Sequence, residues 1–396
     1  MTAGPVADDV TVEQLERDPY PIYARLRREA PVCFVPAVGL WFITRWADAM
    51  AAGQDPERFP ASMPGSPLDR TLGGANVLTV DGEEHRRRRA PMEATLRPKP
   101  LEATASATVE RVAHRLLDDL APNGEAELMS AFCEPFGVLS LAAVIGLPEL
   151  PAHTLMRWFH EIATGTSNYE GDPAKQAVAD CTSAEVDQTL RPRFEELLDR
   201  PDRTMISDML HAERGDLDER LRTLMPSLKL ALIGGLQEPA HGLGTTVVGV
   251  LGDPAQRKEF LADPVGLARN ATEEGIRWVA PIGTQGRAAG RDATVGGVTI
   301  PDGEAVGIMV PSANRDEDVW GPTAAAFDLH RPHHAHAAFG FGPHFCVGLH
   351  LARIQMRVGI RALVERLPQL RLDTDRPPGF RGWEYRGPSE LRVLWG

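Results

Sequence analysis

The residues best suited to chemistry lie in a glycine-rich loop that contains one cysteine, FGFGPHFCVG, residues 339–348. Three glycines in ten residues let the backbone adopt positive φ and pass close to a flat object. Cys346 directly precedes a predicted amphipathic helix over 349–367. The unpaired N–H groups and the dipole of a helix start stabilise a thiolate. The loop therefore predicts a thiolate site, and it leaves open a structural cysteine in a tight turn, since free cysteine is often buried.

The second candidate for chemistry is an acidic residue inside a long apolar segment. Residues 221–251 predict one helix of roughly 30 residues, or about 45 Å, with GGLQEP at 234–239 in its middle. Pro239 cannot donate to the carbonyl of Gly235, so we expect a kink and a free carbonyl there. Glu238, once desolvated, should have a raised pKa and could carry a proton. The alternative is a carboxyl that only binds water or substrate.

Most of the elements that must position these residues are helical. A short helix over 21–28 precedes a predicted hairpin of Val32–Val35 with Leu40–Thr44. Strands are expected again at 293–300 and 305–310 around a Pro-Asp-Gly turn, and a last hairpin at 382–388 with 391–395. We expect a mainly α fold with small β-sheets. Further helices are expected at 105–120, 139–145, 153–163 and 184–198.

Composition narrows the class of protein. The chain has 396 residues, of which 43% are hydrophobic, and this is ample for a large core. A net charge of -13 argues against nucleic acid as the main partner. Four cysteines do not form a disulfide framework, and no uninterrupted apolar stretch is long enough to span a membrane. Residues 1–10 show no signal peptide, so we expect a cytoplasmic protein without a membrane partner.

Several segments together resemble the cytochrome P450 superfamily, over essentially the whole chain. The resemblance implies one domain over residues 1–396, a helical triangular prism around a buried haem. It also implies a structural triad of Glu274, Arg277 and Arg331. The segments that carry the resemblance are Glu274–Arg277, Arg287, FDLHR at 327–331, the loop at 339–348, DGEEH at 81–85 and SANRD at 312–316.

The resemblance implies haem b as the cofactor, with Cys346 as its metal ligand and with Phe339 and Gly340 among the loop residues that bind it. An axial thiolate favours O–O cleavage. By position the propionates are anchored by His85, Arg89, Arg287 and His344. A porphyrin with two carboxylates in an apolar slot needs such partners. For Arg89 an ordinary solvated arginine is the alternative, because it ends the run of arginines at 86–89.

The chain departs from the family at the oxygen-binding helix. Most members have an acid followed by a threonine, whereas this chain has Gln237 followed by Glu238. The usual acid–alcohol mechanism therefore cannot be copied, and we take both residues as catalytic candidates. GxxQEP followed by His241 resembles the bacterial guaiacol-type aryl-ether O-demethylases, as do 126–128, 133–135 and 385–388. Those enzymes hydroxylate the methyl group of a methoxyarene, and the hemiacetal collapses to a phenol and formaldehyde.

The substrate pocket differs from that branch. The demethylases close on a small ring with phenylalanines, whereas Leu72, Thr166 and Tyr385 occupy these places here. With Gly234 and Gly235 they predict a roomier or more polar cavity for a small hydrophobic or aromatic substrate. Two alternatives stay open. One is a biosynthetic P450 that hydroxylates or couples a larger secondary metabolite, and the other is a haem-thiolate protein that only binds a ligand.

The resemblance also implies dioxygen as co-substrate and a separate electron donor, either a flavin/[2Fe-2S] reductase or a ferredoxin. Arg86–Arg88, Arg97 and Arg353 are expected near the thiolate face of the haem. A local positive patch on an acidic protein suits an acidic iron–sulfur donor. Simple solvation of an arginine-rich surface is the alternative.

Overall fold

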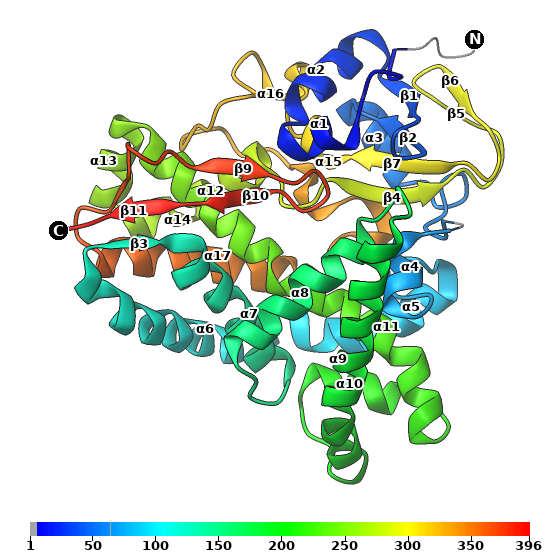
Figure 1. Cartoon of the computed structure of the whole chain (residues 1–396), viewed down its shortest axis with the longest axis horizontal. Coiled ribbons are helices and arrows are strands. Elements are labelled where there is room, and N and C mark those ends of the chain that lie inside the picture. Colours follow the sequence, from blue (N-terminus) through cyan, green and yellow to red (C-terminus); the bar gives the residue numbers. More distant parts are fainter. Residues whose placement is uncertain (1–5, 64) are drawn as a thin grey trace.

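Helices fill the lower part of the molecule, and small sheets with the N-terminal helices cover its upper edge (Figure 1). The structure is a computed structural model, and it describes residues 6–63 and 65–396. The expected lack of a signal peptide concerns residues 1–10, of which 1–5 lie outside the described residues. Among the described residues, no helix combines the length and apolar character needed to cross a membrane. That residues 1–396 form one domain stays a prediction.

The predicted class, mainly α with small sheets, is confirmed. Side chains cap several of the helices. For example, Asp216 accepts from the Glu219 N–H at the start of α11 and forms a capping box. The helices are α1 (Val12–Arg17), α2 (Tyr20–Glu29), α3 (Trp46–Gly53), α4 (Pro67–Leu72), α5 (Gly82–Leu96), α6 (Pro98–Leu120), α7 (Glu134–Ile145), α8 (Ala152–Thr166), α9 (Pro173–Asp199), α10 (Met205–Ala212), α11 (Leu217–Leu236), α12 (Glu238–Gly252), α13 (Pro254–Ala262), α14 (Pro264–Trp278), α15 (Val310–Ala313), α16 (Glu317–Trp320) and α17 (Leu349–Arg366).

The strands form four small sheets, and the predicted hairpin of β1 with β2 is confirmed. The largest sheet has the order β1-β2-β7-β4, with β2 and β7 parallel. The other sheets pair β5 with β6, β9 with β10, and β3 and β8 with β11. The strands are β1 (Val32–Val35), β2 (Leu40–Ile43), β3 (Glu125–Glu127), β4 (Thr284–Ala288), β5 (Ala293–Val295), β6 (Val298–Ile300), β7 (Ala305–Met309), β8 (Arg371–Leu372), β9 (Gly379–Arg381), β10 (Gly387–Glu390) and β11 (Arg392–Leu394).

Two predicted strand pairs are wrong. The segment 293–300 folds back on itself as β5 and β6, because Gly296 and Gly297 adopt φ of 56° and 78° and form the turn. β7 therefore pairs with β2 and β4 rather than across the Pro-Asp-Gly turn. The C-terminal hairpin is also absent, since β10 pairs with β9 and β11 pairs with β3 and β8. Local turn signals could not show that β7 pairs with β2 or that β11 pairs with β3, because these partners are distant in sequence.

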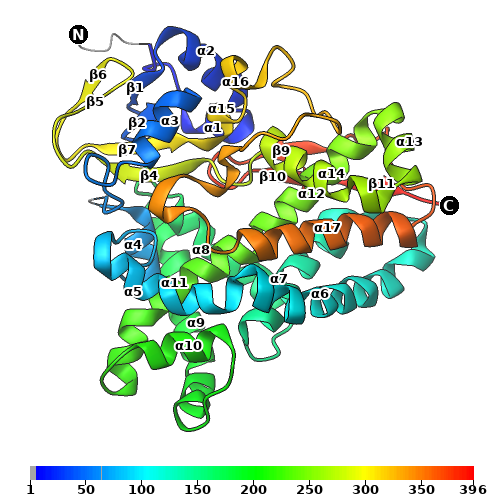
Figure 2. The same ribbon diagram turned by 180° about the vertical axis from the view of Figure 1, so that it is seen from behind.

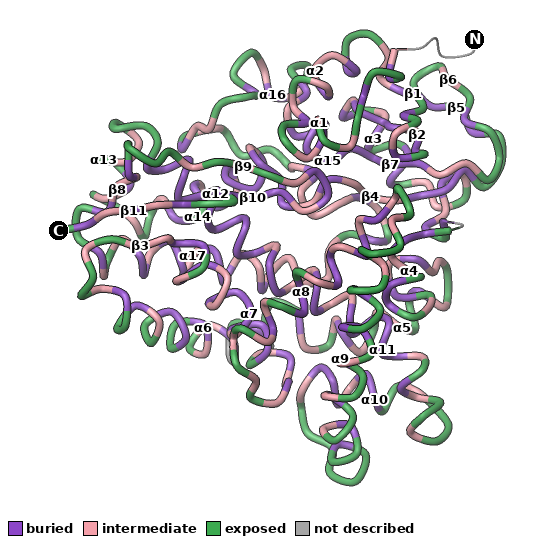
Figure 3. The backbone as a smooth tube through the Cα atoms, in the orientation of Figure 1, coloured by how far each residue is buried: buried purple, intermediate pink, exposed green. Residues whose placement is uncertain are grey.

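The predicted helix over 221–251 is two helices. α11 ends at Leu236 and α12 begins at Glu238, so the expected kink at Pro239 is a break at Gln237. Pro239 supplies no N–H and its ring restricts the preceding residue, which is why the ladder stops there. α12 is buried over 239–251, whereas exposed residues lie on outer elements such as α6 and around α10 (Figure 3). The predicted helix after the cysteine loop is confirmed as α17, which lies between α14 and α6 in Figure 2.

Candidate active site

The cysteine loop is held in shape by its own backbone. The Cys346 N–H donates to the Phe339 carbonyl at 2.9 Å, which closes the loop ahead of α17. Gly340 and Gly342 adopt φ of 73° and 68°, a region that favours glycine. A Cβ on Gly342 would lie 2.2 Å from the carbonyl oxygen of Gly53 in α3. The loop is therefore pressed against α3, and glycine is required at this contact.

A side chain that the sequence reading missed also holds the loop. The Gln285 Nε2 donates to the Phe341 carbonyl at 3.0 Å, and the Phe341 N–H donates to Gln285 Oε1 at 3.1 Å. The donor and the acceptor of the buried Gln285 amide therefore both bind the backbone of Phe341 in the loop. Gln285 lies in β4, so the four-stranded sheet positions the loop that carries Cys346. A lone glutamine in a short strand offers no sequence signal for such a role.

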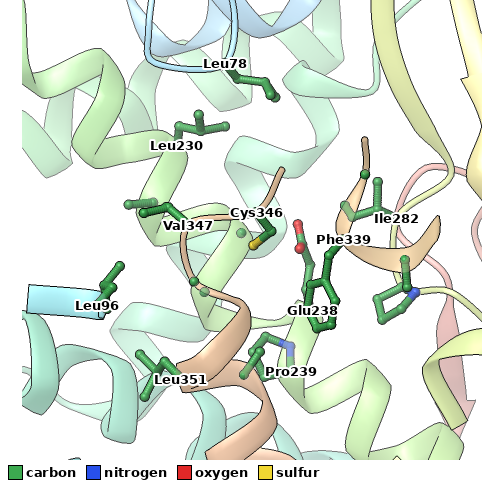
Figure 4. A pocket seen from close by; sticks show the side chains of 18 of the residues that line it. Leu78, Leu96, Leu230, Glu238, Pro239, Ile282, Phe339, Cys346, Val347 and Leu351 are labelled. Atoms are coloured by element: carbon green, nitrogen blue, oxygen red, sulfur yellow. The ribbon is translucent and has the colours of Figure 1, made fainter. Parts of the chain in front are cut away.

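A large cavity lies between this loop and the broken helix. It encloses about 1500 Å³ of empty space, including its opening to solvent. Figure 4 shows Cys346 projecting into it from the loop and Glu238 from the start of α12, beside Pro239. Most of the wall is aliphatic, and it includes Val77, Leu78, Met92, Leu96, Leu141, Met205, Leu230, Ala231, Ile276, Ile282, Val310, Val347 and Leu351. The polar groups on the wall are those of Arg89, Glu238, Thr284, Gln285, His344, Cys346 and Gln355.

Glu238 is an acid in an apolar setting. No described residue lies within hydrogen-bonding distance of its carboxyl, and burial raises the pKa of Glu238 to about 8. A Cβ on Gly234, one turn earlier, would lie 3.6 Å from Glu238 Oε1, which is an ordinary van der Waals contact, so the carboxyl does not require glycine there. At neutral pH the group is therefore a neutral acid that can donate a hydrogen bond into the cavity. Gly234 and Gly235 line the same cavity, as expected.

Buried nitrogen atoms without partners gather beside the cavity. Among the described residues, His85 Nε2, His344 Nδ1 and Arg287 Nη2 have no hydrogen-bond partner. The His85 and His344 rings lie 4.2 Å apart, and His344 Nε2 is within 2.8 Å of Asp81 Oδ1. Burial, with a smaller effect of His344, lowers the pKa of His85 to about 4, and burial lowers that of Arg287 to about 10. Unpaired buried donors are costly, so this cluster is suited to an anion.

Comparisons with known proteins agree with this geometry. The family model "Cytochrome P450" matches residues 265–380. The chain is 29% identical to the 6-deoxyerythronolide B hydroxylase of Saccharopolyspora erythraea, over 99% of both chains. It is 29% identical to the vitamin D(3) 25-hydroxylase of Pseudonocardia autotrophica, over 94% of this chain and 92% of that one. The crystal structure of the myxobacterial cytochrome P450 CYP267B1 with myristic acid superposes with a TM-score of 0.86 at 26% identity, covering 100% of both chains.

The chain belongs to the cytochrome P450 superfamily. It has the P450 fold and is a P450 monooxygenase whose cofactor is haem. The residues present fit this group. Cys346 offers one sulfur to the cavity, and the three unpartnered donors of His85, Arg287 and His344 could hold the propionates. Burial raises the pKa of the Cys346 thiol to about 11, and a bound metal cation reverses that preference.

Arg89 lines the cavity, but its guanidinium is already engaged. Arg89 Nε lies 2.5 Å from Glu93 Oε1, one helical turn along α5. This pairing uses Nε, and the terminal nitrogen atoms could still bind a haem carboxylate. Phe339 and Gly340 line the cavity directly. The structure thus brings all seven predicted cofactor residues to the cavity or to the donor cluster beside it.

The three residues of the predicted structural triad lie together, away from the cavity wall. Arg277 Nε donates to Glu274 Oε2 at 2.7 Å, and Arg331 Nε donates to Glu274 Oε1 at 2.9 Å. Arg277 also donates to the carbonyls of Asn314 and Ala324. All three side chains are largely buried. The network ties α14 to the chain that leads into the cysteine loop.

Four residues predicted to be catalytic or to line the substrate pocket do not line this cavity. Gln237 faces away from it, because its Nε2 donates to Glu134 Oε1 in α7 at 3.0 Å. Leu72 is packed in the core among α4 neighbours. The hydroxyls of Thr166 and Tyr385 lie 2.9 Å apart and share a hydrogen bond, which holds Tyr385 against the last residue of α8. Position in the sequence suggested pocket residues here, and packing directs these side chains elsewhere.

The arginines expected on the thiolate side are partly neutralised. Arg353 donates to both oxygens of Glu273 at 2.7 and 2.6 Å. Arg87 and Arg88 pair with Glu84, and Arg87 also with Glu213. Arg86 and Arg97 are exposed. A positive patch for an electron donor would therefore consist chiefly of these last two residues.

Proposed function

We propose that this P450 O-demethylates a methoxyarene. The observation that supports it best is Glu238, a partly buried acid without a hydrogen-bond partner among the described residues, in a cavity with aliphatic walls. A pure hydrocarbon would leave this acid unsatisfied, at a cost of roughly 1–3 kcal/mol. An aryl ether oxygen accepts one hydrogen bond and places its methyl group nearby. The substrate class is thus matched to this donor.

In this proposal each residue has a separate task. Cys346 would bind the iron through its sulfur, and His85, Arg89, Arg287 and His344 would hold the propionates. When bound, the haem activates dioxygen for hydroxylation of a C–H bond. Dioxygen, two electrons and two protons convert the methyl ether into a hemiacetal and water, and the hemiacetal collapses to a phenol and formaldehyde. Glu238 orients the ether oxygen and holds a proton at its carboxyl.

A second candidate is hydroxylation of a larger, mainly aliphatic molecule. The cavity wall is aliphatic, and Leu72, Thr166 and Tyr385, which were expected to line a roomier or more polar substrate pocket, lie outside it. The relatives include proteins named as hydroxylases of 6-deoxyerythronolide B and of vitamin D(3). Oxygen atoms on such a molecule would also pair with Glu238.

Spectral titration followed by product analysis separates the candidates. Holoenzyme is titrated with a series of methoxyarenes, with the matching hydroxyarenes as controls, and with a fatty acid and a steroid. Formaldehyde equal to the NADH consumed, with any methoxyarene, supports O-demethylation. Hydroxylated fatty acid or steroid without formaldehyde from any methoxyarene supports the second candidate. Spectral binding without any oxidised product would contradict both and favour a ligand-binding role.

A further inference from the structure

A second cavity lies on the other side of the helix break. It holds about 780 Å³ of empty space, including its opening, and shares no lining residue with the first cavity. Its wall is about equally polar and apolar, and it contains carboxylates, imidazoles and an amide. The residues that line it are Glu16, Glu127, Met129, Ser130, Glu134, His160, Gln237, His241, Arg381, Gly382, Tyr385, Gly387, Pro388 and Ser389.

Hydrogen bonding defines what this cavity offers to a ligand. Glu134 can only accept, so the Gln237 group 3.0 Å from it must be the amide nitrogen. The same nitrogen lies 2.8 Å from His241 Nε2, which must then accept, so the proton of the neutral ring is on Nδ1. Burial lowers the pKa of His241 to about 3, which keeps the ring neutral. Gln237 Oε1 is then a free acceptor and His241 Nδ1 a free donor.

Both of these atoms are buried and have no partner among the described residues. Gln237 is 4% and His241 is 8% exposed. A ligand that both donates and accepts would satisfy the pair, and water does so. The described residues contain no group of three or more His, Cys, Asp or Glu side chains placed to hold a metal ion. The chemistry of the cavity therefore favours water over a cation.

The break forms the wall between the two cavities. The consecutive residues Gln237 and Glu238 line opposite sides of it. Among the described residues, the N–H groups of Gln237, Glu238 and Ala240 have no backbone partner. α12 resumes with a bond from the His241 N–H to the Gln237 carbonyl at 2.8 Å. Buried peptide groups of this kind are normally satisfied by water.

We propose that the second cavity holds a chain of water molecules that carries protons from the exposed His160, by way of the Glu134 carboxylate, through the helix break to Glu238. His160 is about half exposed at the mouth, and its Nε2 lies 3.5 Å from Glu134 Oε2. Gln237 and His241 position the water and are not themselves proton carriers. This inference rests on the proposed monooxygenase function, which consumes two protons with two donor electrons for each dioxygen. The water route would take the place of the acid–alcohol pair that this chain lacks, and it would approach from the opposite face of the helix break.

The first test is structural and independent of turnover. A high-resolution crystal structure of the haem-loaded protein should show ordered water on Gln237 Oε1 and His241 Nδ1, continuing to the break. In Gln237→Leu this water should be lost while the cavity around Cys346 is unchanged. A dry second cavity in the wild-type holoenzyme would overturn the proposal, whatever the substrate proves to be.

The second test measures proton supply. Glu134→Gln should lower NADH-driven product formation by about tenfold, raise peroxide release and increase the solvent deuterium isotope effect. Glu149→Gln removes an exposed carboxylate elsewhere and is the matched control. Hydrogen peroxide brings its own protons and electrons, so peroxide-driven turnover of Glu134→Gln should equal that of the wild type.

Two results of the second test would contradict the water route. One is an unchanged rate, peroxide yield and isotope effect in both Glu134→Gln and Gln237→Leu. The other is an equal loss of NADH-driven and peroxide-driven turnover, which would indicate a structural defect instead. If no methoxyarene is demethylated, peroxide release during NADH oxidation still reports on the route. Failure of the proposed substrate is thereby separated from failure of the inference.

Discussion

Glu238 and Cys346 face the same cavity with opposite charge requirements. Burial raises the pKa of Glu238 to about 8 and that of Cys346 to about 11. The acid is useful in its neutral form, which the apolar wall favours without help. The thiol is useful as a thiolate, which needs a cation. One environment thus keeps a proton on Glu238 and makes the ionisation of Cys346 depend on the metal.

Replacing the sulfur tests the axial ligand. Cys346→Ala should abolish the red-shifted Soret band of the carbon-monoxide complex, because no other side chain that lines the described cavity carries a thiol. Cys181→Ala, at an exposed position, is the control and should keep the band. A red-shifted band in Cys346→Ala would show that the assignment is wrong. The measurement is a reduced-plus-carbon-monoxide difference spectrum.

The proton on Glu238 should be visible in the pH profile. The carboxyl holds its proton below about pH 8, so the ratio of product to NADH consumed should be highest there and fall as the pH rises through this value. Glu238→Gln keeps a hydrogen-bond donor but cannot exchange a proton, so its ratio should be several-fold lower and independent of pH near 8. Identical profiles for the two proteins would reduce Glu238 to a contact for substrate or water.

At the scale of elements, the cysteine loop depends on glycine where it meets α3. In Gly342→Ala the new methyl group would lie 2.2 Å from the Gly53 carbonyl oxygen, on a backbone with φ of 68°. Strain of about 1–3 kcal/mol plus the clash should displace the loop and lower the haem content of the purified protein. Gly348→Ala is the control, since its nearest neighbour would be Cys346 Sγ at 3.8 Å with φ of -85°. Equal haem content in the two variants would contradict this argument.

The segment around Glu384 should make stability depend on pH. Thr284 donates to this buried carboxyl from its N–H at 3.1 Å and from its hydroxyl at 2.8 Å, next to Gln285 of β4. Burial nevertheless raises the pKa of Glu384 from 4.5 to about 7. The folded protein therefore keeps a proton that the unfolded chain loses above pH 4.5. The free energy of unfolding should fall by ~3 kcal/mol between pH 4.5 and 7 for this group.

Urea unfolding at pH 5 and pH 7 measures this contribution. Glu384→Gln removes the titration but keeps a side chain of the same shape, so the difference in unfolding free energy between the two pH values should be smaller than in the wild type. Glu149→Gln, at an exposed position, should leave the difference unchanged. A wild-type difference retained in Glu384→Gln would assign the pH dependence to other groups.

At the scale of the whole molecule, a net charge of -13 makes local positive charge decisive for an acidic electron donor. Arg353, Arg87 and Arg88 are paired with carboxylates, so the exposed Arg86 is expected to contribute more to steering. Arg86→Glu should slow reduction by a [2Fe-2S] donor several-fold at low salt. The difference should shrink at 1 M salt, where the Debye length is about 3 Å.

Stopped-flow reduction over a range of salt concentrations measures this effect. Arg291→Glu, in the exposed turn between β4 and β5, makes the same change of charge elsewhere and is the control. An equal slowing in both variants would point to net charge instead of a docking patch.

Local patterns predicted much of the architecture. The β1–β2 hairpin and α17 lie where turn residues and apolar periodicity placed them, because both are determined by neighbours in the sequence. The pairings of β5 with β6 and of β10 with β9 were not predicted. Both pairings are local: the two glycines at 296–297 close β5 on β6, and five residues separate β9 from β10, so the sequence reading missed two turns. Gln285 was missed for a different reason, since its partner Phe341 is distant in sequence.

The amino-acid sequence by itself determined the cysteine loop, the ion pair of Glu274 with Arg277, and an acid next to a helix-breaking proline, because each depends on residues a few positions apart. Only the tertiary structure decided that Gln237 and Glu238 face different cavities. Helical periodicity loses its phase where the helix is interrupted, so the direction of each side chain there is set by its partners. Gln237 donates to Glu134 of α7 on one side of the break. Glu238 lies on the other side, within the aliphatic wall, and has no hydrogen-bond partner among the described residues.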